Sequence, residues 1–245
     1  MPLRSPTVNY DQQSALSYNH HASILPICTG LARRITIFLN NEADTPLLKA
    51  VQDQTRSSLG VIDAALERYS VDEISLAYHG SQECLVLLIL LLCALARLET
   101  PLPRALQTVY VASPEALAEV DSFVSESVAA YRLDLTRYAL PKKDAFKAYL
   151  EERNKVKAIM VGARRSDPHG ETLTYFDQTE PGWPAFLRVH PVVDWGHEEI
   201  SAFIHHFEIP YCSVYSQNMS PGGTFRKSSL AGMDDHDHGY GRQMY

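Results

Sequence analysis

Several features of secreted and membrane-spanning proteins are scarce in this sequence of 245 residues. It has only four cysteines and no C-x-x-C pair, so we expect buried, reduced thiols rather than a disulfide framework or a metal site. The longest apolar run, residues 84–96, is shorter than the roughly 20 residues that cross a bilayer. Residues 1–19 are polar and lack the pattern of a secretory signal. We therefore expect a cytoplasmic protein without a membrane partner.

Basic residues are also few. The chain has 22 lysines and arginines against 29 aspartates and glutamates, which gives a formal net charge of -7 at pH 7. This balance argues against a nucleic-acid partner, because neutralising a phosphate backbone requires clustered cations in excess. A small phosphorylated ligand needs only a few local cations and backbone N–H groups. We expect a small-molecule partner, and the sequence leaves the oligomeric state open.

Strand-like and helix-like patterns alternate from residue 73 onward. A capping Thr45 and Pro46 come first and begin a helix that we expect to reach residue 69. The later expected strands cover residues 73–78, 108–112, 133–135 and 156–162, and the later helices cover residues 84–98, 114–131 (capped by Ser113), 142–154 and 200–207. This order predicts an α/β fold with a mostly parallel, twisted sheet and flanking helices.

Two polar loops follow predicted strands and carry the candidate chemistry. The first reads His79-Gly80-Ser81-Gln82-Glu83, and the second reads Arg164-Arg165-Ser166-Asp167-Pro168. Ligands of parallel sheets bind beyond the carboxyl ends of the strands, so both loops are expected at the binding edge. The first loop precedes a helix N-terminus, which suits phosphate, and the two arginines of the second can also grip phosphate.

The second loop lies in a longer stretch that resembles a known family. Residues 156–168 read V-K-A-I-M-V-G-A-R-R-S-D-P, residues 183–186 read W-P-A-F, and residues 188–195 read R-V-H-P-V-V-D-W. These stretches, followed by residues 209–212 and Tyr215, strongly resemble the eukaryotic-type FAD synthetase (FMN adenylyltransferase) family. The resemblance implies the adenine-nucleotide α-hydrolase-like fold that this family shares with the PAPS reductases.

The resemblance also implies a reaction and a set of site residues. The reaction is FMN plus ATP, as its Mg²⁺ complex, giving FAD and pyrophosphate. The resemblance places the nucleotide and phosphate groups at Gly80, Ser81, Gln82, Arg164, Arg165 and Arg242. It places the flavin at Glu180, Trp183, Arg188, Asp194 and Trp195. No residue is assigned as a metal ligand.

The first loop departs from the family pattern. Where the family reads S-F-N-G-G-K-D, this chain reads A-Y-H-G-S-Q-E, so a glycine and a lysine are replaced by Ser81 and Gln82. Two alternatives therefore stand beside FAD synthesis. One is an enzyme on the same fold that acts on another small molecule, with acid–base chemistry by His79, Glu83, Asp167 and His190. The other is a non-catalytic flavin or nucleotide binder.

We divide the chain into three parts. Residues 1–43 form an N-terminal segment of uncertain role, and residues 44–215 form the α/β core. Residues 216–245 form a C-terminal tail that contains Arg242 and an aspartate- and histidine-rich cluster at residues 234–238. Because the resemblance assigns Arg242 to phosphate binding, we expect this tail to pack on or near the site.

Overall fold

The computed structural model describes residues 23–112 and 117–215. A six-stranded sheet runs through the molecule in the order β3-β2-β1-β4-β6-β5. Its strands are β1 (Ile74–Ala77), β2 (Leu106–Val111), β3 (Leu133–Tyr138), β4 (Ala158–Val161), β5 (Phe176–Gln178) and β6 (Leu187–Val189). All neighbouring strands pair in parallel except β5, which is antiparallel to β6. The predicted mostly parallel sheet is confirmed.

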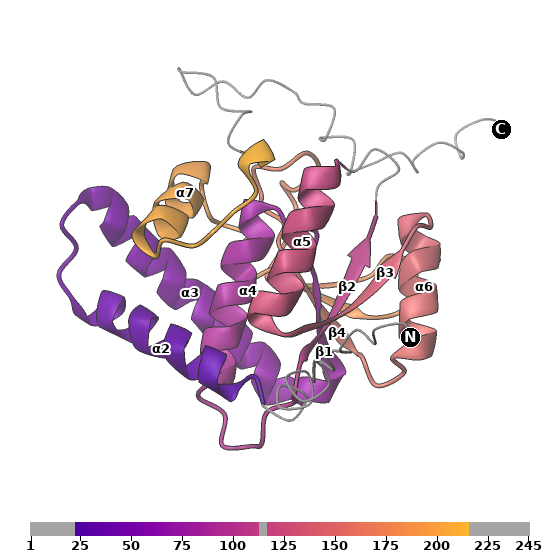
Figure 1. Cartoon of the computed structure of the whole chain (residues 1–245). Coiled ribbons are helices and arrows are strands. Elements are labelled where there is room, and N and C mark those ends of the chain that lie inside the picture. Colours follow the sequence, from indigo (N-terminus) through magenta and orange to yellow (C-terminus); the bar gives the residue numbers. More distant parts are fainter. Residues whose placement is uncertain (1–22, 113–116, 216–245) are drawn as a thin grey trace, which may run out of the picture.

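Helices cover both faces of this sheet (Figure 1). They are α2 (Leu25–Asn40), α3 (Pro46–Arg68), α4 (Gln82–Leu95), α5 (Ala118–Tyr131), α6 (Lys142–Glu152) and α7 (His197–His206), with short 3-10 turns η1 (Val71–Glu73) and η2 (Ser213–Tyr215). The predicted start of α3 is confirmed, because the Thr45 side chain accepts the Leu48 N–H with Pro46 at the first helical position.

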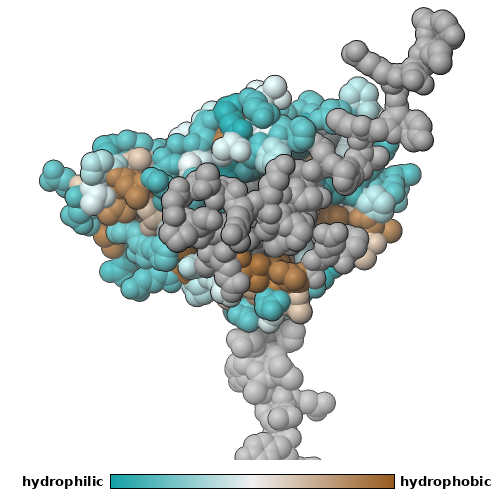
Figure 2. All heavy atoms as spheres, turned by 90° about the horizontal axis from the view of Figure 1, so that it is seen from above, coloured by the Kyte–Doolittle hydropathy of each residue, from teal (hydrophilic) through white to brown (hydrophobic). Residues whose placement is uncertain are grey.

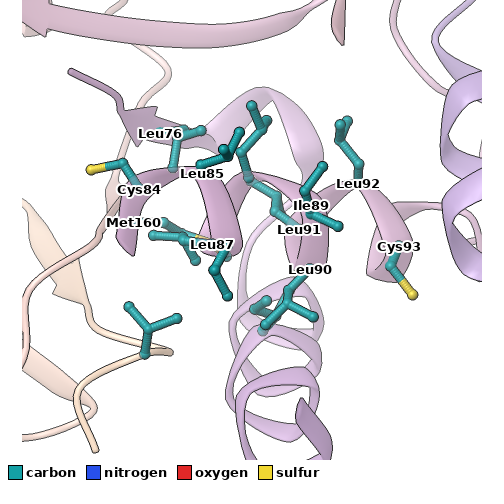
Figure 3. Packing of buried hydrophobic residues seen from close by; sticks show 14 of the residues in the cluster. Leu76, Cys84, Leu85, Leu87, Ile89, Leu90, Leu91, Leu92, Cys93 and Met160 are labelled. Atoms are coloured by element: carbon teal, nitrogen blue, oxygen red, sulfur yellow. The ribbon is translucent and has the colours of Figure 1, made fainter. Parts of the chain in front are cut away.

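Two hydrophobic clusters fill the space between the layers. Alternate strand residues point to opposite faces, so Met160 joins the larger cluster and its neighbour Ile159 joins the smaller one. The larger cluster surrounds α4, whose residues are apolar on every side, and Figure 3 shows them packed against Leu76 and Met160. The smaller cluster lies beneath α6. A helix with no polar face must be covered all round, which explains why α2, α3 and α7 all pack against α4.

Helix α2 takes part in the same core. Its buried residues Cys28, Ile35 and Phe38 belong to the larger cluster, and Arg34 donates to the Phe207 carbonyl at the end of α7. Within the N-terminal segment of residues 1–43, the part that the structure describes is therefore built into the core of the α/β unit.

Some predicted boundaries were wrong. Helix α5 begins at Ala118, after Leu117 in an extended conformation, and the expected cap Ser113 lies outside the described residues. Strand β3 extends to Tyr138, beyond the predicted residue 135, because it pairs with β2 along its whole length. The strands β5 and β6 were missed; each has three residues, too few to show an alternating pattern.

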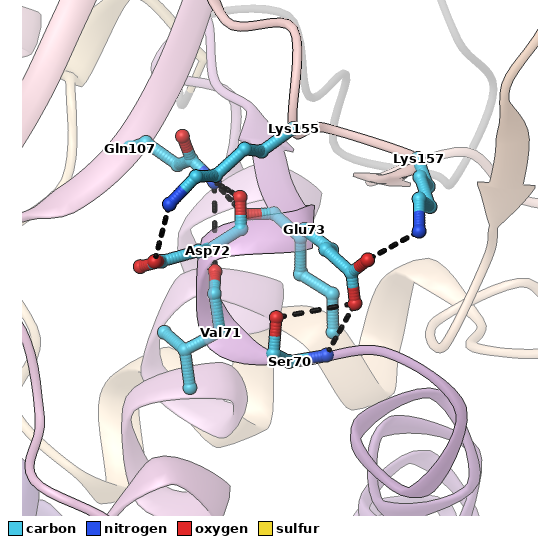
Figure 4. Close-up of polar contacts among 8 residues, drawn as sticks. Ser70, Val71, Asp72, Glu73, Gln107, Lys155 and Lys157 are labelled. Atoms are coloured by element: carbon cyan, nitrogen blue, oxygen red, sulfur yellow. Dashed lines mark hydrogen bonds and ion pairs between the residues drawn. The ribbon is translucent and has the colours of Figure 1, made fainter.

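The amino ends of β1 and β4 are joined by polar contacts opposite the candidate site. Ser70 and Glu73 cap η1, and Lys157 donates to Glu73 at 2.5 Å, as Figure 4 shows. Beside this pair, Gln107 of β2 donates to the carbonyls of Asp72 and Ile74. These contacts fix the starts of three adjacent strands.

The visible surface in Figure 2 is mostly hydrophilic, with separate hydrophobic patches. In the part of the chain that the structure describes, the exposed large apolar residues are Leu25 and Ile37 of α2, Leu47 of α3, and Leu117 and Leu140 outside the helices and strands. Isolated residues of this kind are normal on proteins. Among the described residues, no helix combines the length and apolar character needed to cross a membrane.

Candidate functional site

The site lies where the strand order changes direction. From the central strand β1 the chain crosses to β2 on one side, and β4 then adds on the other side. Such a switch point in a parallel sheet leaves a crevice at the carboxyl ends of the strands, which is the usual ligand position. The two predicted polar loops follow β1 and β4, so the fold places them beside each other as expected.

The loop after β1 turns sharply into helix α4. Gly80 has φ +83°, in the left-handed region, and a Cβ there would lie 2.9 Å from a Val124 methyl. Ser81 then caps α4, and its hydroxyl accepts the Cys84 N–H. The N–H groups of Gln82 and Glu83 have no helical carbonyl within reach, so the helix end is suited to an anion.

A thiol and an imidazole meet in this loop. The Cys84 Sγ lies 3.4 Å from His79 Nδ1 and 3.9 Å from Nε2. Gly162, directly after β4, packs so closely on Cys84 that an added Cβ would lie 3.0 Å from Sγ. Burial raises the pKa of the Cys84 thiol, but the charge and hydrogen bonds of His79, with a contribution from Ser81, outweigh it and lower the pKa.

The loop after β4 brings a buried arginine between two carboxylates. Arg164 is only 7% exposed; it contacts Asp167 Oδ1 through Nε at 3.1 Å and Nη2 at 2.8 Å, and Glu83 Oε1 at 3.2 Å. Asp167 also accepts the Arg164 backbone N–H. Burial raises the pKa of Asp167 despite these contacts. The ion cluster Glu83–Arg164–Asp167 thus joins both loops across the switch point.

The second arginine of the loop points to a different partner. Arg165 Nε donates to Asp194 Oδ1 at 2.5 Å and its Nη1 donates to the Leu173 carbonyl. Tyr175 donates to the other Asp194 oxygen at 2.7 Å. Burial raises the pKa of Asp194, and the hydrogen bonds from Arg165 and Tyr175 lower it more, so the net shift is downward. Asp194 is therefore a carboxylate that ties three loop segments together.

The expected flavin residues are divided between the surface and the core. Arg188 of β6 donates to the Glu180 carboxylate at 3.2 Å. Trp183 lies in the turn that follows Glu180, and its backbone N–H donates to the Glu180 carbonyl. Trp195 is only 2% exposed and donates to Ser58 of α3 at 2.8 Å. The Trp195 indole therefore packs between helices, while the Glu180–Arg188 pair remains at the surface edge near β5.

His190 is held inside the loop after β6. It is 2% exposed, its Nδ1 lies 2.9 Å from the Thr174 carbonyl oxygen, and Asp177 lies 3.4 Å away. Burial lowers the pKa of His190, although the contacts with Thr174 and Asp177 oppose the shift. The structure thus places His190 among backbone and side-chain partners within the protein.

The structure brings together the predicted residues of the two central loops: His79, Gly80, Ser81, Gln82, Glu83, Arg164 and Asp167. Arg242 lies outside the described residues.

Sequence reasoning missed Cys84 as a site residue, together with Gly162 and Tyr175. A signal existed for Cys84, because it is the third residue of a helix that begins in the loop, five positions after His79. No local pattern marked Tyr175. Among the described residues, no group of three or more His, Cys, Asp or Glu could hold a metal.

Comparisons with known proteins agree with this geometry. The fold and its switch-point loops define an α/β protein of the nucleotide-binding type, and residues 73–229 match the family model of the phosphoadenosine phosphosulfate reductase domain. The probable FAD synthase of Schizosaccharomyces pombe is 32% identical over 199 residues, which are 80% of this chain and 72% of that protein.

Solved structures of FMN adenylyltransferase from Candida glabrata are also similar. The complex with FAD and inorganic pyrophosphate has a TM-score of 0.73 at 26% identity, covering 80% of this chain and 70% of that chain. The complex with FMN and the ATP analogue AMPCPP has a TM-score of 0.72 at 26% identity, with the same coverage. This chain belongs to the eukaryotic-type FAD synthetases within the PAPS reductase-like proteins.

Proposed function

We propose that this protein transfers the adenylyl group of ATP to FMN and forms FAD and pyrophosphate. The observation that carries the proposal is the meeting of the α4 N-terminus with the loop after β4 at the switch point of the sheet. Relatives of the same family have been solved with FMN and an ATP analogue, and with FAD and pyrophosphate. The same small molecules are therefore the expected ligands of this chain.

In the proposed reaction a phosphate oxygen of FMN attacks the α-phosphorus of ATP. A P–O bond forms between them, the bond from the α-phosphorus to the bridging oxygen breaks, and pyrophosphate leaves. The protein does not need a covalent intermediate for this step, so its task is to position the two phosphates and stabilise the developing charge. The N–H groups at the start of α4 are the first candidates for that role.

The arginines have different roles in this proposal. Arg164 lies beside the α4 N-terminus, but its single positive charge is shared by two carboxylates, Glu83 and Asp167, so its main role is to position the loop. Arg165 is more exposed, with a side-chain exposure of 41%, and can turn from Asp194 to a ligand phosphate. Glu180 and Arg188 then border the flavin, next to Trp183.

Magnesium enters the proposal as part of the ATP substrate. Mg²⁺ in such sites is usually held by one or two carboxylates and by the phosphates of the nucleotide. Glu83 and Asp167 supply two carboxylates at the junction of the loops, which fits that donor set. When bound, the ion would neutralise phosphate charge.

The test is FAD synthesis by the purified protein. FMN, ATP and Mg²⁺ are incubated with it and FAD is measured by chromatography; the control omits ATP. We expect FAD and pyrophosphate in equal amounts. Binding of FMN without turnover would instead support the flavin binder. If neither FMN nor ATP binds in calorimetry, the adenylyltransferase proposal is wrong.

A further inference from the structure

A cavity lies at one corner of the helical layer, where the chain passes from α2 to α3 beside the end of α7 (Figure 1). Its volume is about 350 Å³, within the roughly 300–1,000 Å³ of small-molecule sites. In the described chain its lining contains no residue of the two central loops. The cavity is therefore a separate place from the candidate site, and adenylyl transfer gives it no role.

Gln52 of α3 presents a buried hydrogen-bond acceptor to this cavity. The residue is 3% exposed, and its Nε2 donates to the carbonyls of Phe38 at 2.7 Å and Asn41 at 2.9 Å. These two bonds fix the orientation of the side-chain amide. Its Oε1 accepts no hydrogen bond from the part of the chain that the structure describes, and it keeps access to the cavity that Gln52 lines. A buried acceptor without a partner favours a ligand that donates hydrogen bonds.

The charges around the cavity favour a cation. Glu42 and Asp44 line it, are exposed, and form no ion pair with the described residues. Arg34 also lines it, but this guanidinium donates to the Phe207 carbonyl and lies over the Phe207 ring, 5.7 Å from the centroid. The C-terminal end of α2 adds partial negative charge. Two carboxylates without ion pairs thus face one guanidinium that is already bound within the protein.

Aromatic and aliphatic side chains give the cavity an apolar side. The rings of Phe38 and Phe207 lie 5.2 Å apart, and His206 packs on Phe38 at 4.6 Å. Ile37 lines the same cavity and is 51% exposed. Flat cations bind well against aromatic rings, as Arg34 does at Phe207. The lining therefore suits a planar cation that carries an apolar body.

We propose that this cavity binds a small organic cation, with an amidinium or guanidinium group on an apolar body. The N–H groups of the cation donate to Gln52 Oε1, and the carboxylates of Glu42 and Asp44 balance its charge. The apolar body lies against Phe38 and Ile37. This binding does not depend on FAD synthesis, so the proposal is tested separately from the proposed function.

The experiment is a titration of the full-length protein with benzamidine, followed by proton–nitrogen correlation spectra. Benzamide is the neutral ligand control, because it has nearly the same shape and lacks the charge. The cavity variant combines Glu42→Gln with Asp44→Asn. Its matched control combines Glu67→Gln with Glu151→Gln, which removes the same charge from exposed positions outside the lining. All four side chains are exposed, so both variants should fold, and circular dichroism checks this.

We expect benzamidine to give saturable shifts at the residues that line the cavity, including the side-chain NH₂ signal of Gln52. The Kd should rise about fivefold in the cavity variant and stay unchanged in the control variant, since each exposed carboxylate contributes only modestly. Benzamide should bind at least about fivefold more weakly than benzamidine. The proposal is wrong if no saturable shifts occur there, if the shifts map to the two central loops, if benzamide binds equally well, or if both variants respond alike.

Discussion

At the scale of single residues, the charged groups of the site are held mainly by one another. Arg164 contacts Glu83 and Asp167, and Arg165 contacts Asp194. A phosphate ligand must therefore compete with carboxylates for both guanidinium groups. This competition lowers the gain from each arginine, and it makes the uncharged donors at the start of α4 more important for binding.

Gly80 is the residue whose conformation fixes the first loop. We predict that Gly80→Ala destabilises the protein by about 1–2 kcal/mol, because a Cβ is unfavourable in the left-handed region; contact with Val124 adds to this cost. Gly60→Ala is the matched control: an added Cβ at Gly60 has no neighbour within 4 Å, and alanine in a helix interior stabilises by roughly 0.5–1 kcal/mol. Urea unfolding followed by circular dichroism measures both. Equal effects of the two changes would contradict the role of Gly80.

Asp167 is predicted to matter for catalysis through Arg164. In Asp167→Asn a neutral acceptor replaces the carboxylate, so the buried guanidinium turns toward Glu83 and the loop after β4 shifts. A charged hydrogen bond contributes roughly 1.5–3 kcal/mol, so we expect kcat/KM for FAD synthesis to fall about 10- to 100-fold. Steady-state kinetics tests this result.

The control for that variant is Asp53→Asn. Asp53 makes a similar set of contacts with Lys49 and Arg56, but on the exposed side of α3. Exposed pairs contribute little, on the order of 0–1 kcal/mol, so activity should not change. An Asp167→Asn enzyme with unchanged kinetics would show that the ion cluster supports neither loop geometry nor catalysis.

The residues of the site were only partly predictable from the sequence. The two loops could be found because each follows an apolar strand, and a parallel sheet brings such strand ends to one edge. The partners of each charge could not be found. Glu83 and Arg164 are 81 positions apart in the sequence, too far for a local pattern to pair them. The segment between Arg165 and Asp194 includes β5 and β6, so their contact also depends on how the chain folds back.

At the scale of elements, polar residues lie at both ends of strand β1. The carboxyl end leads to the site, and the amino end is fixed by Glu73, which pairs with Lys157 before β4. The hydrogen bond from Lys157, followed by those from Ser70, lowers the pKa of Glu73 to about 2. Because Glu73 and Lys157 join the starts of β1 and β4, they help to align the two strands that carry the loops.

This pKa predicts how stability depends on acid. A carboxyl with a lowered pKa stabilises the fold above its ordinary pKa of 4.5, and that contribution is lost as pH falls toward about 2. We therefore expect Glu73→Gln to be less stable than wild type at pH 7 and to approach it between pH 4.5 and 2. Urea unfolding across this range gives the difference. Glu67→Gln, at an exposed position on α3, is the control for removal of a carboxylate.

The elements themselves were largely predictable, for physical reasons that also explain the misses. Helix α4 is a long apolar run, strand β4 is a continuous apolar segment followed by a polar loop, and α3 has a threonine cap and a proline at its start. Strands β5 and β6 have no comparable signal, since each is short and depends on pairing with a neighbour. Their absence from the prediction hid the turn that carries Glu180 and Trp183.

At the scale of the whole molecule, the helices around α4 form the rigid support of the binding edge. Helices α2, α3 and α7 pack against α4, and α4 begins in the first loop. The segment after β6 is also attached to α3, because the Trp195 indole N–H donates to the Ser58 hydroxyl. A ligand that binds the two loops therefore contacts groups anchored in the main core, and its binding energy should stabilise the entire fold.

This coupling predicts a thermal shift for each substrate. FMN and the ATP analogue AMPCPP, which allows binding without adenylyl transfer, should each raise the melting temperature. A ligand at 100 times its Kd adds about 2.7 kcal/mol, which corresponds to roughly 5–10 °C for a chain of this size. Riboflavin is the control, because it lacks the phosphate and should give a smaller shift than FMN. If FMN raises the melting temperature but AMPCPP does not at any concentration, the protein binds flavin and has lost its nucleotide site.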